Sequence, residues 1–163
     1  MKASVKIEKK DLFIFLLYHM YMRAMGIVYL VVGLLALAGG IWFLVSGNRS
    51  GIFLLLIAAV YFVLQPCMLY LKAAQQAKLP VLRKETFYDF SREGIRVSQD
   101  ETDASTLKWE KIRRFVKFGG EYMIYLDDIH ANIVPERTLS CEPQALDALV
   151  REMLPKKNRR GIK

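Results

Sequence analysis

The chain has 163 residues, a formal net charge of +8 and an apolar fraction of 53%. Two long stretches account for the apolar excess, and what remains is too short for more than one small soluble domain. The two cysteines, Cys67 and Cys141, lie in different parts of the chain, which excludes a disulfide framework and a cysteine-based metal site.

Residues 1–23 are predicted to form a short strand and a helix. Residues 3–8 alternate apolar and polar side chains, as strands do. Asp11 can cap a helix over residues 12–22, because its carboxylate can accept from first-turn amides. That helix is too short to span a bilayer, and joining it to the next apolar stretch would draw Arg23 into hydrocarbon. We therefore expect an interfacial amphipathic helix on the inner leaflet.

Residues 24–72 are predicted to form a two-helix transmembrane hairpin. Its spans, residues 24–46 and 51–71, are almost wholly apolar, and Arg49 is the only charge between residues 24 and 71. At about 1.5 Å per residue, each span is long enough for a hydrocarbon core of about 30 Å. The polar residues 47–50 fit a tight turn back into the bilayer, so the lipid bilayer is the first expected partner.

Basic residues beside the spans predict the orientation. Eight of them flank the outer ends of the hairpin, whereas Arg49 alone lies in its turn. The flanking residues are Lys6, Lys9, Lys10, Arg23, Lys72, Lys78, Arg83 and Lys84. By the positive-inside rule the protein is multi-pass, with both termini cytoplasmic. A membrane protein with this orientation needs positive charge beside its spans, and this need accounts for much of the net charge. No nucleic-acid partner is therefore expected.

Glycines recur every seven residues in the first span. Seven residues are nearly two helical turns, so Gly26, Gly33 and Gly40 form one stripe. Small residues let neighbouring membrane helices approach closely. We favour packing of this stripe against Ala58 and Ala59 of the second span; homo-oligomerisation is the alternative.

Residues 79–155 are predicted to form a small antiparallel β domain closed by a C-terminal helix. About six strands are expected, at residues 85–90, 95–98, 107–109, 112–118, 122–126 and 129–134. Turns are expected at residues 91–94, 119–120 and 127–128, with a loop at 99–105. Residues 142–154 have helical spacing, and the basic tail 156–163 is expected to be disordered.

The apolar residues of this domain predict its core. Trp109, Phe118, Tyr122 and Ile124 are expected to pack against Leu146 and Leu149. A small curved sheet or partly open barrel closed by one helix is the general architecture of pleckstrin-homology-like modules. The predicted fold class is thus an α+β membrane protein, with a transmembrane hairpin and a β domain.

Several short motifs resemble the bacterial YcxB-like family. They are the Asp11-capped apolar helix, the Phe90-x-x-x-Gly94-Ile95 strand end, the Trp109-x-x-Ile112 pair and Ile133-Val-Pro-Glu-Arg137. Members are small bacterial membrane proteins with a cytoplasmic domain thought to be pleckstrin-homology-like. The resemblance implies the bacterial inner membrane and carries no activity, cofactor or catalytic residue with it.

The strongest candidate contact surface is a basic and aromatic row on the strand at residues 112–118. If Val116 points to the core, then Arg113, Phe115 and Lys117 point outward together. Such a row near the inner leaflet could meet anionic headgroups or a protein partner. An ordinary solvated strand face is the alternative, since charge runs are usually that.

Other polar groups suggest no chemistry. Asp127 and Asp128 suit a turn, and with His130 they lack a fourth metal ligand. His130 has no activated nucleophile beside it. We therefore expect no enzyme activity, no cofactor and no metal site.

We expect a membrane-anchored, non-enzymatic binding or scaffold module that presents its β domain to anionic lipid or a membrane protein. The alternative is an accessory or structural subunit of a larger membrane complex. A transporter is less favoured, because Gln65 is the only uncharged polar side chain deep in either span.

Overall fold

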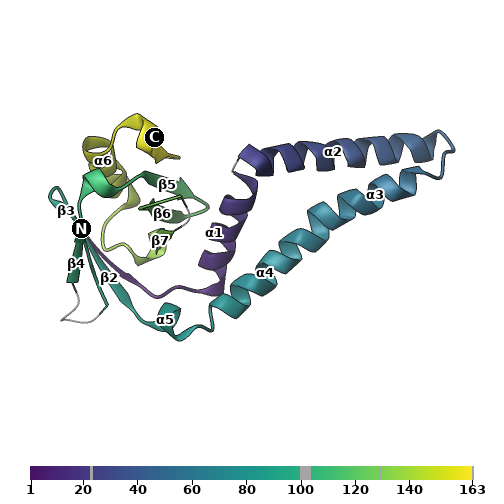
Figure 1. The fold of residues 1–163 in the computed structure, drawn as a ribbon. Coiled ribbons are helices and arrows are strands. Elements are labelled where there is room, and N and C mark those ends of the chain that lie inside the picture. The colour runs from purple at the N-terminus through teal and green to yellow at the C-terminus, as the bar shows by residue number, and fades with distance from the viewer. Residues whose placement is uncertain (23, 100–103, 129, 163) are drawn as a thin grey trace. The chain divides into compact units, whose positions relative to one another are not determined.

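The computed structural model describes residues 1–22, 24–99, 104–128 and 130–162 (Figure 1). The chain divides into two compact units. One comprises Met1–Phe15 and Gln76–Lys163, and the other comprises Leu16–Gln75. The division falls inside helix α1 (Lys9–Tyr21), not at residue 23 as predicted. The first fifteen residues are therefore part of the β unit.

The first sheet of the β unit is antiparallel, in the order β1-β2-β3-β4. Its strands are β1 (Lys2–Val5), β2 (Thr86–Ser91), β3 (Gly94–Ser98) and β4 (Ala104–Leu107). The register places Ala3 opposite Tyr88 and Ile95 opposite Leu107. The strand that precedes the apolar helices thus pairs with the first strand that follows them.

The second sheet has the order β7-β6-β5-β8. Its strands are β5 (Arg114–Phe118), β6 (Glu121–Tyr125), β7 (Ala131–Pro135) and β8 (Arg159–Arg160). The first three are antiparallel, whereas β8 pairs with β5 in parallel. The prediction of a disordered tail is wrong here, because a short 3-10 helix, Lys156–Asn158, leads directly into β8. Ladder hydrogen bonds to β5 hold this end of the chain in place.

The core lies between the two sheets and helix α6 (Pro143–Met153), which covers the second sheet (Figure 1). Trp109, Tyr122 and Ile124 are buried there with Leu146 and Leu149, as predicted. Trp109 Nε1 also donates to Ser91 O at 2.9 Å. Phe118 is an exception to the prediction: it is half-buried and lies outside this cluster.

The opposite face of the second sheet is covered by the beginning of α1. Phe15 stacks on Tyr125 with ring centroids 6.4 Å apart. Ile14 lies against Gly119, where a Cβ atom would come within 2.9 Å of Ile14 Cγ2. All five residues of β6 are buried, so this sheet has no solvent-facing side at its centre. Leu12 is also buried, and the expectation that this helix lies on a lipid surface is wrong for its first turns.

The strands differ from their predicted positions around residue 107. Instead of a strand at residues 107–109, β4 ends at Leu107 and Trp109–Lys111 form a 3-10 helix. Ala104 and Ser105 of the predicted loop belong to β4. Residues 100–103 of that loop, together with Arg23 and residue 129, lie outside the described residues. Residues 79–155 contain six strands, β2 to β7, as predicted; β1, also predicted, and the unpredicted β8 bring the total in the described part of the chain to eight.

The second unit contains the two long apolar helices. Helix α2 (Ala24–Val45) is followed by α3 (Gly51–Ala59), a π-helical turn (Val60–Leu64) and α4 (Gln65–Gln76). Gly26–Val45 and Gly51–Gln76 are long and apolar enough to cross a membrane, each with a mean hydropathy of 2.4. The π-helical turn ends at Leu64, two residues before Pro66, which has no N–H to donate. The fold class is therefore α+β with two long apolar helices.

Candidate functional site

The predicted basic and aromatic row does not form a single outward face. Phe115 is fully buried in the core, with its ring 6.4 Å from Trp109 and 5.8 Å from Tyr122 between centroids. It therefore cannot contact a partner together with Arg113 and Lys117. The register that we expected for β5 is wrong, because both Phe115 and Val116 are buried on opposite faces.

Arg113 is exposed but paired. Its Nη1 lies 3.1 Å from Asp128 Oδ2, and Nη2 of the adjacent Arg114 lies 3.7 Å from Asp128 Oδ1. The Arg114 guanidinium also sits 5.3 Å from the centre of the Tyr125 ring. Asp128 thus neutralises part of the charge that the row was expected to present, and such exposed pairs contribute little to stability.

Lys117 joins the second sheet to α6. Its Nζ lies 2.8 Å from Asp147 Oδ2 and 2.9 Å from Glu136 Oε1. The Tyr122 hydroxyl donates to the other Asp147 oxygen at 2.7 Å. Burial lowers the pKa of Lys117, but its hydrogen bonds with Asp147 and Glu136 outweigh this and raise the pKa. Lys117 is thus a charged structural cross-link.

A second charged cluster holds the beginning of α1 against the second sheet. Arg137 donates to both oxygens of Asp11 at 2.7 Å, and its Nη1 lies 3.7 Å from Glu121 Oε1. Asp11 and Glu121 are both buried. Asp11 occupies the third helical position and accepts from the backbone N–H of Glu8 at 2.8 Å, so it caps the first turn from inside the helix.

The two carboxylates compete for one cation. Burial, followed by the nearby charge of Asp11 and a hydrogen bond with it, raises the pKa of Glu121 to about 8. A like charge at close range disfavours ionisation of both groups, so Glu121 keeps a proton near neutral pH. Sequence reasoning missed this cluster, since Asp11 and Arg137 are 126 residues apart.

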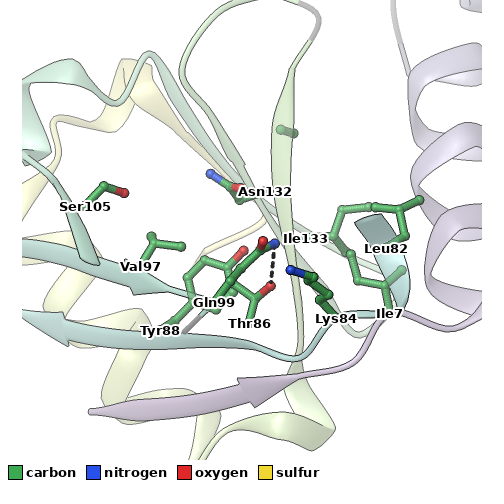
Figure 2. A pocket seen from close by; sticks show the side chains of 11 residues that line it. Ile7, Leu82, Lys84, Thr86, Tyr88, Val97, Gln99, Ser105, Asn132 and Ile133 are labelled. Carbon is green, nitrogen blue, oxygen red and sulfur yellow. Dashed lines mark hydrogen bonds between the residues drawn. The ribbon is translucent and has the colours of Figure 1, made fainter. Parts of the chain in front are cut away.

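A cavity of about 460 Å³ lies in the β unit, where the first sheet meets β7 (Figure 2). Ile7, Val97, Ile133 and Leu82 of the short helix α5 (Pro80–Arg83) supply apolar walls. Polar groups also face the space. They come from Thr86, Tyr88, Gln99, Ser105 and Asn132.

Tyr88 gives this cavity its polar centre. It is 5% exposed, and its ring stacks on Phe90 with centroids 6.3 Å apart. In Figure 2 the hydroxyl points toward Gln99 and Asn132, and Gln99 Nε2 donates to Thr86 Oγ1 at 3.3 Å. Burial raises the pKa of Tyr88 to about 12, so the hydroxyl is protonated at neutral pH and can donate.

Four exposed lysines on two neighbouring segments of the β unit form a basic group. Asn158 Nδ2 donates to Ile112 O at 3.4 Å, which brings the 3-10 helix Lys156–Asn158 beside Trp109–Lys111. The exposed lysines on these two segments are Lys108, Lys111, Lys156 and Lys157. No ion pair is seen for any of the four among the described residues, so their charges are available to a partner.

Polar residues after β6 form local contacts. His130 Nδ1 lies 2.7 Å from Asp127 Oδ2, and Asp127 Oδ1 also accepts from the His130 backbone N–H. Asp128 is held by the two arginines of β5. In the parts of the chain that the structure describes, no group of three or more His, Cys, Asp or Glu residues is placed to hold a metal ion.

The glycines of α2 lie on its contact face with the second apolar helix. A Cβ atom on Gly33 would lie 2.9 Å from Tyr61 Cδ1, and one on Gly40 would lie 2.8 Å from Leu55 Cδ2. The Tyr61 hydroxyl donates to Gly26 O at 3.4 Å. Close approach of the two helices at these points requires glycine.

The partners of that stripe differ from those expected. Ala58 is buried, but Ala59 is exposed and faces away from the packed core of the unit. The contacts come instead from larger side chains of α3 and the π-helical turn. Those side chains lie against Gly33 and Gly40, whereas Gly26 lies against the backbone of Met20 and Tyr21 in α1.

These features define an α+β protein whose β unit has two four-stranded sheets and a C-terminal helix, and whose other unit has two long apolar helices. The family described as YcxB-like protein matches residues 90–153, from β2 to the end of α6. The resemblance seen in the sequence is confirmed for these residues. No curated protein and no solved structure matched the chain.

Proposed function

We propose that this chain is a membrane-anchored, non-enzymatic binding module that presents its β unit at the cytoplasmic leaflet. The observation that carries the proposal is the pairing of β1 with β2 on either side of the apolar helices. Strands of one sheet must lie on the same side of a membrane. A membrane segment between them must therefore cross an even number of times, and two helices that are each long and apolar enough to span would meet this requirement.

The basic residues favour the cytoplasmic side for that sheet. Eight Lys or Arg residues flank the outer ends of the two helices, against Arg49 alone in their connection. By the positive-inside rule, both termini and the β unit then face the cytoplasm, and in a bacterium the membrane is the inner one. The exposed apolar side chains of the helices, such as Trp42 and Val45, would contact lipid.

We also propose that the β unit is pleckstrin-homology-like. Two packed four-stranded sheets with one helix over the core support this assignment. The helix pair would then be an insertion between the first two strands of such a module. Fold alone does not give function, so the binding role rests on the membrane anchor and on the exposed basic group.

The four exposed lysines are the best-supported contact for anionic lipid. Each cation near a membrane surface contributes about 1 kcal/mol toward anionic headgroups. We propose these lysines as the lipid contact in place of Arg113, Phe115 and Lys117, which are paired or buried. A membrane protein partner with an acidic surface would suit the same charges.

Cysteine labelling in spheroplasts tests the membrane topology. In a Cys67→Ser background, native Cys141 should react with a membrane-impermeant maleimide only after permeabilisation. With Cys141→Ser added, Asn48→Cys in the helical connection should react in intact spheroplasts. Labelling of Cys141 in intact spheroplasts, or release of the chain by alkaline carbonate, would rule out the proposed anchor and orientation.

Hydrogen exchange in nanodiscs tests the lipid contact. The full chain is needed, because a fragment beginning at residue 78 would lack β1 and expose the edge of β2. Adding phosphatidylglycerol to a phosphatidylcholine nanodisc should slow amide exchange in Lys156–Asn158, and high salt should reverse this. The double variant Lys156→Gln, Lys157→Gln should no longer show slower exchange when phosphatidylglycerol is added. Arg113→Gln is the matched control and should still show it.

A further inference from the structure

The cavity in Figure 2 has features of a ligand site that the proposed membrane role does not use. Its volume of about 460 Å³ falls within the range of small-molecule pockets, and its walls combine apolar side chains with a few convergent polar groups. All of its described lining residues belong to the β unit. Its shape therefore depends only on that unit.

The Tyr88 hydroxyl is the central observation. The side chain is more than nine-tenths buried, yet its hydroxyl has no hydrogen-bond partner among the described residues. The hydroxyl oxygen is not itself among the fully buried polar atoms that have no partner, because it opens onto the cavity and can bond to whatever fills it. Because Tyr88 lines the cavity, an occupant of the cavity can supply the missing acceptor.

Asn132 lies on the matching wall. In the register of the second sheet it is opposite Ile124, so it shares the core-facing side of β7 with Val134. Its amide has no hydrogen-bond partner among the described residues, and it is half-buried. A carboxamide offers both a donor and an acceptor, and it can therefore bind a carbonyl or an amide.

The chemistry of the lining favours a neutral ligand. The groups that face the interior are a phenol, two amides and two hydroxyls, all uncharged at neutral pH. Lys84 is the only charged residue in the described lining; it is exposed, and in Figure 2 its amine points toward Thr86 and Gln99. An ion placed against the apolar walls would lose its hydration without a buried counter-charge.

We propose that this cavity binds a small, neutral, amphipathic molecule whose carbonyl or amide oxygen accepts from Tyr88 and whose apolar body lies against Ile7, Val97 and Ile133. Asn132 pairs with the second polar atom of the same group. The apolar contacts supply most of the affinity, and the two polar side chains supply its selectivity.

Methyl NMR of the full chain in nanodiscs tests the proposal. The protein is labelled at isoleucine methyl groups and titrated with acetanilide, which has an apolar ring and a neutral amide. The signals of Ile7 and Ile133 should shift saturably, whereas Ile95, deep in the core, should not shift. Methyl benzoate should bind similarly, and benzoate, its anionic relative, more weakly.

Tyr88→Phe isolates the polar contact. The ring and its stacking on Phe90 remain, so the fold should be preserved, and affinity for acetanilide should fall about 3- to 10-fold for the loss of one hydrogen bond. Tyr70→Phe in α4 is the matched control and should bind as the native chain does. Unshifted Ile7 and Ile133 signals with both neutral probes would overturn the site. Equal affinity in Tyr88→Phe, or tighter binding of benzoate, would overturn the ligand chemistry.

Discussion

Replacing Glu121 by glutamine should remove a pH-dependent loss of stability in the β unit. Glu121 is buried beside Asp11, with Arg137 shared between them and with Glu8 and Lys10 nearby. Its pKa rises from an ordinary 4.5 to about 8 on folding. Because the folded-state pKa is raised, this site's stabilisation is complete below the unfolded pKa and is lost as the pH rises to about 8. Glutamine cannot ionise, and it can still donate to Asp11 as a protonated carboxyl does.

The magnitude follows from the same shift. Each pKa unit corresponds to about 1.4 kcal/mol, so the native chain should lose about 3 kcal/mol between pH 4.5 and 7, and about 4 kcal/mol by pH 8. Relative to the native chain, Glu121→Gln should gain stability by this amount over the same interval. Any constant effect of the substitution cancels, because the prediction concerns only the change with pH.

Urea unfolding of the full chain in detergent micelles measures this difference. Trp42→Phe in every sample leaves Trp109, which lies in the core of the β unit, as the only tryptophan reporter. Glu93→Gln, at an exposed turn, is the matched control and should track the native chain at every pH. Asp11→Asn should be destabilised throughout, since it weakens the bidentate contact with Arg137. A difference between Glu121→Gln and the native chain that stays constant from about pH 5 to pH 8 would refute the reasoning.

Three further substitutions test other contacts. Gly161 has φ +76°, and a Cβ atom there would lie 2.1 Å from Lys117 O, so Gly161→Ala should release β8 and speed amide exchange in β5. Gly40→Ala should destabilise the packing of the two apolar helices by about 1–2 kcal/mol in thermal unfolding, whereas neighbouring Gly39→Ala, which meets only a 3.4 Å contact, should not. Lys117→Met should cost about 3 kcal/mol in urea unfolding, because it leaves a buried carboxylate of α6 without its cation. Arg113→Met, which breaks an exposed pair, should cost less than about 1 kcal/mol.

Local sequence patterns predicted the elements of the molecule well. The two long apolar helices and the hairpin turns at Gly94 and Gly119–Gly120 follow from hydropathy and from glycine's tolerance of positive φ, and all are confirmed. The apolar face of α6 is also confirmed, since Leu146, Leu149 and Val150 are buried. These features depend on residues close together in the chain, whose spacing alone specifies them.

The candidate contact surface failed for a physical reason. An outward Phe115 requires one face of β5 to meet solvent, as period-two alternation normally implies. Here the second sheet is covered on one side by α6 and the first sheet and on the other by α1, so both faces bury side chains. Alternation then no longer separates inside from outside. A strand buried on both sides cannot be oriented from its own sequence.

Sequence alone determined the two apolar helices, most of the strands and turns, and the amphipathic face of the last helix, because each depends on short-range spacing. Only the tertiary structure decided that β1 completes a sheet begun after those helices, that Arg137 meets Asp11, and that Tyr88 and Asn132 face one cavity. Each of these contacts joins residues distant in the chain. No local pattern records such a pairing, since it arises only when the packed sheets and helices bring the two segments together.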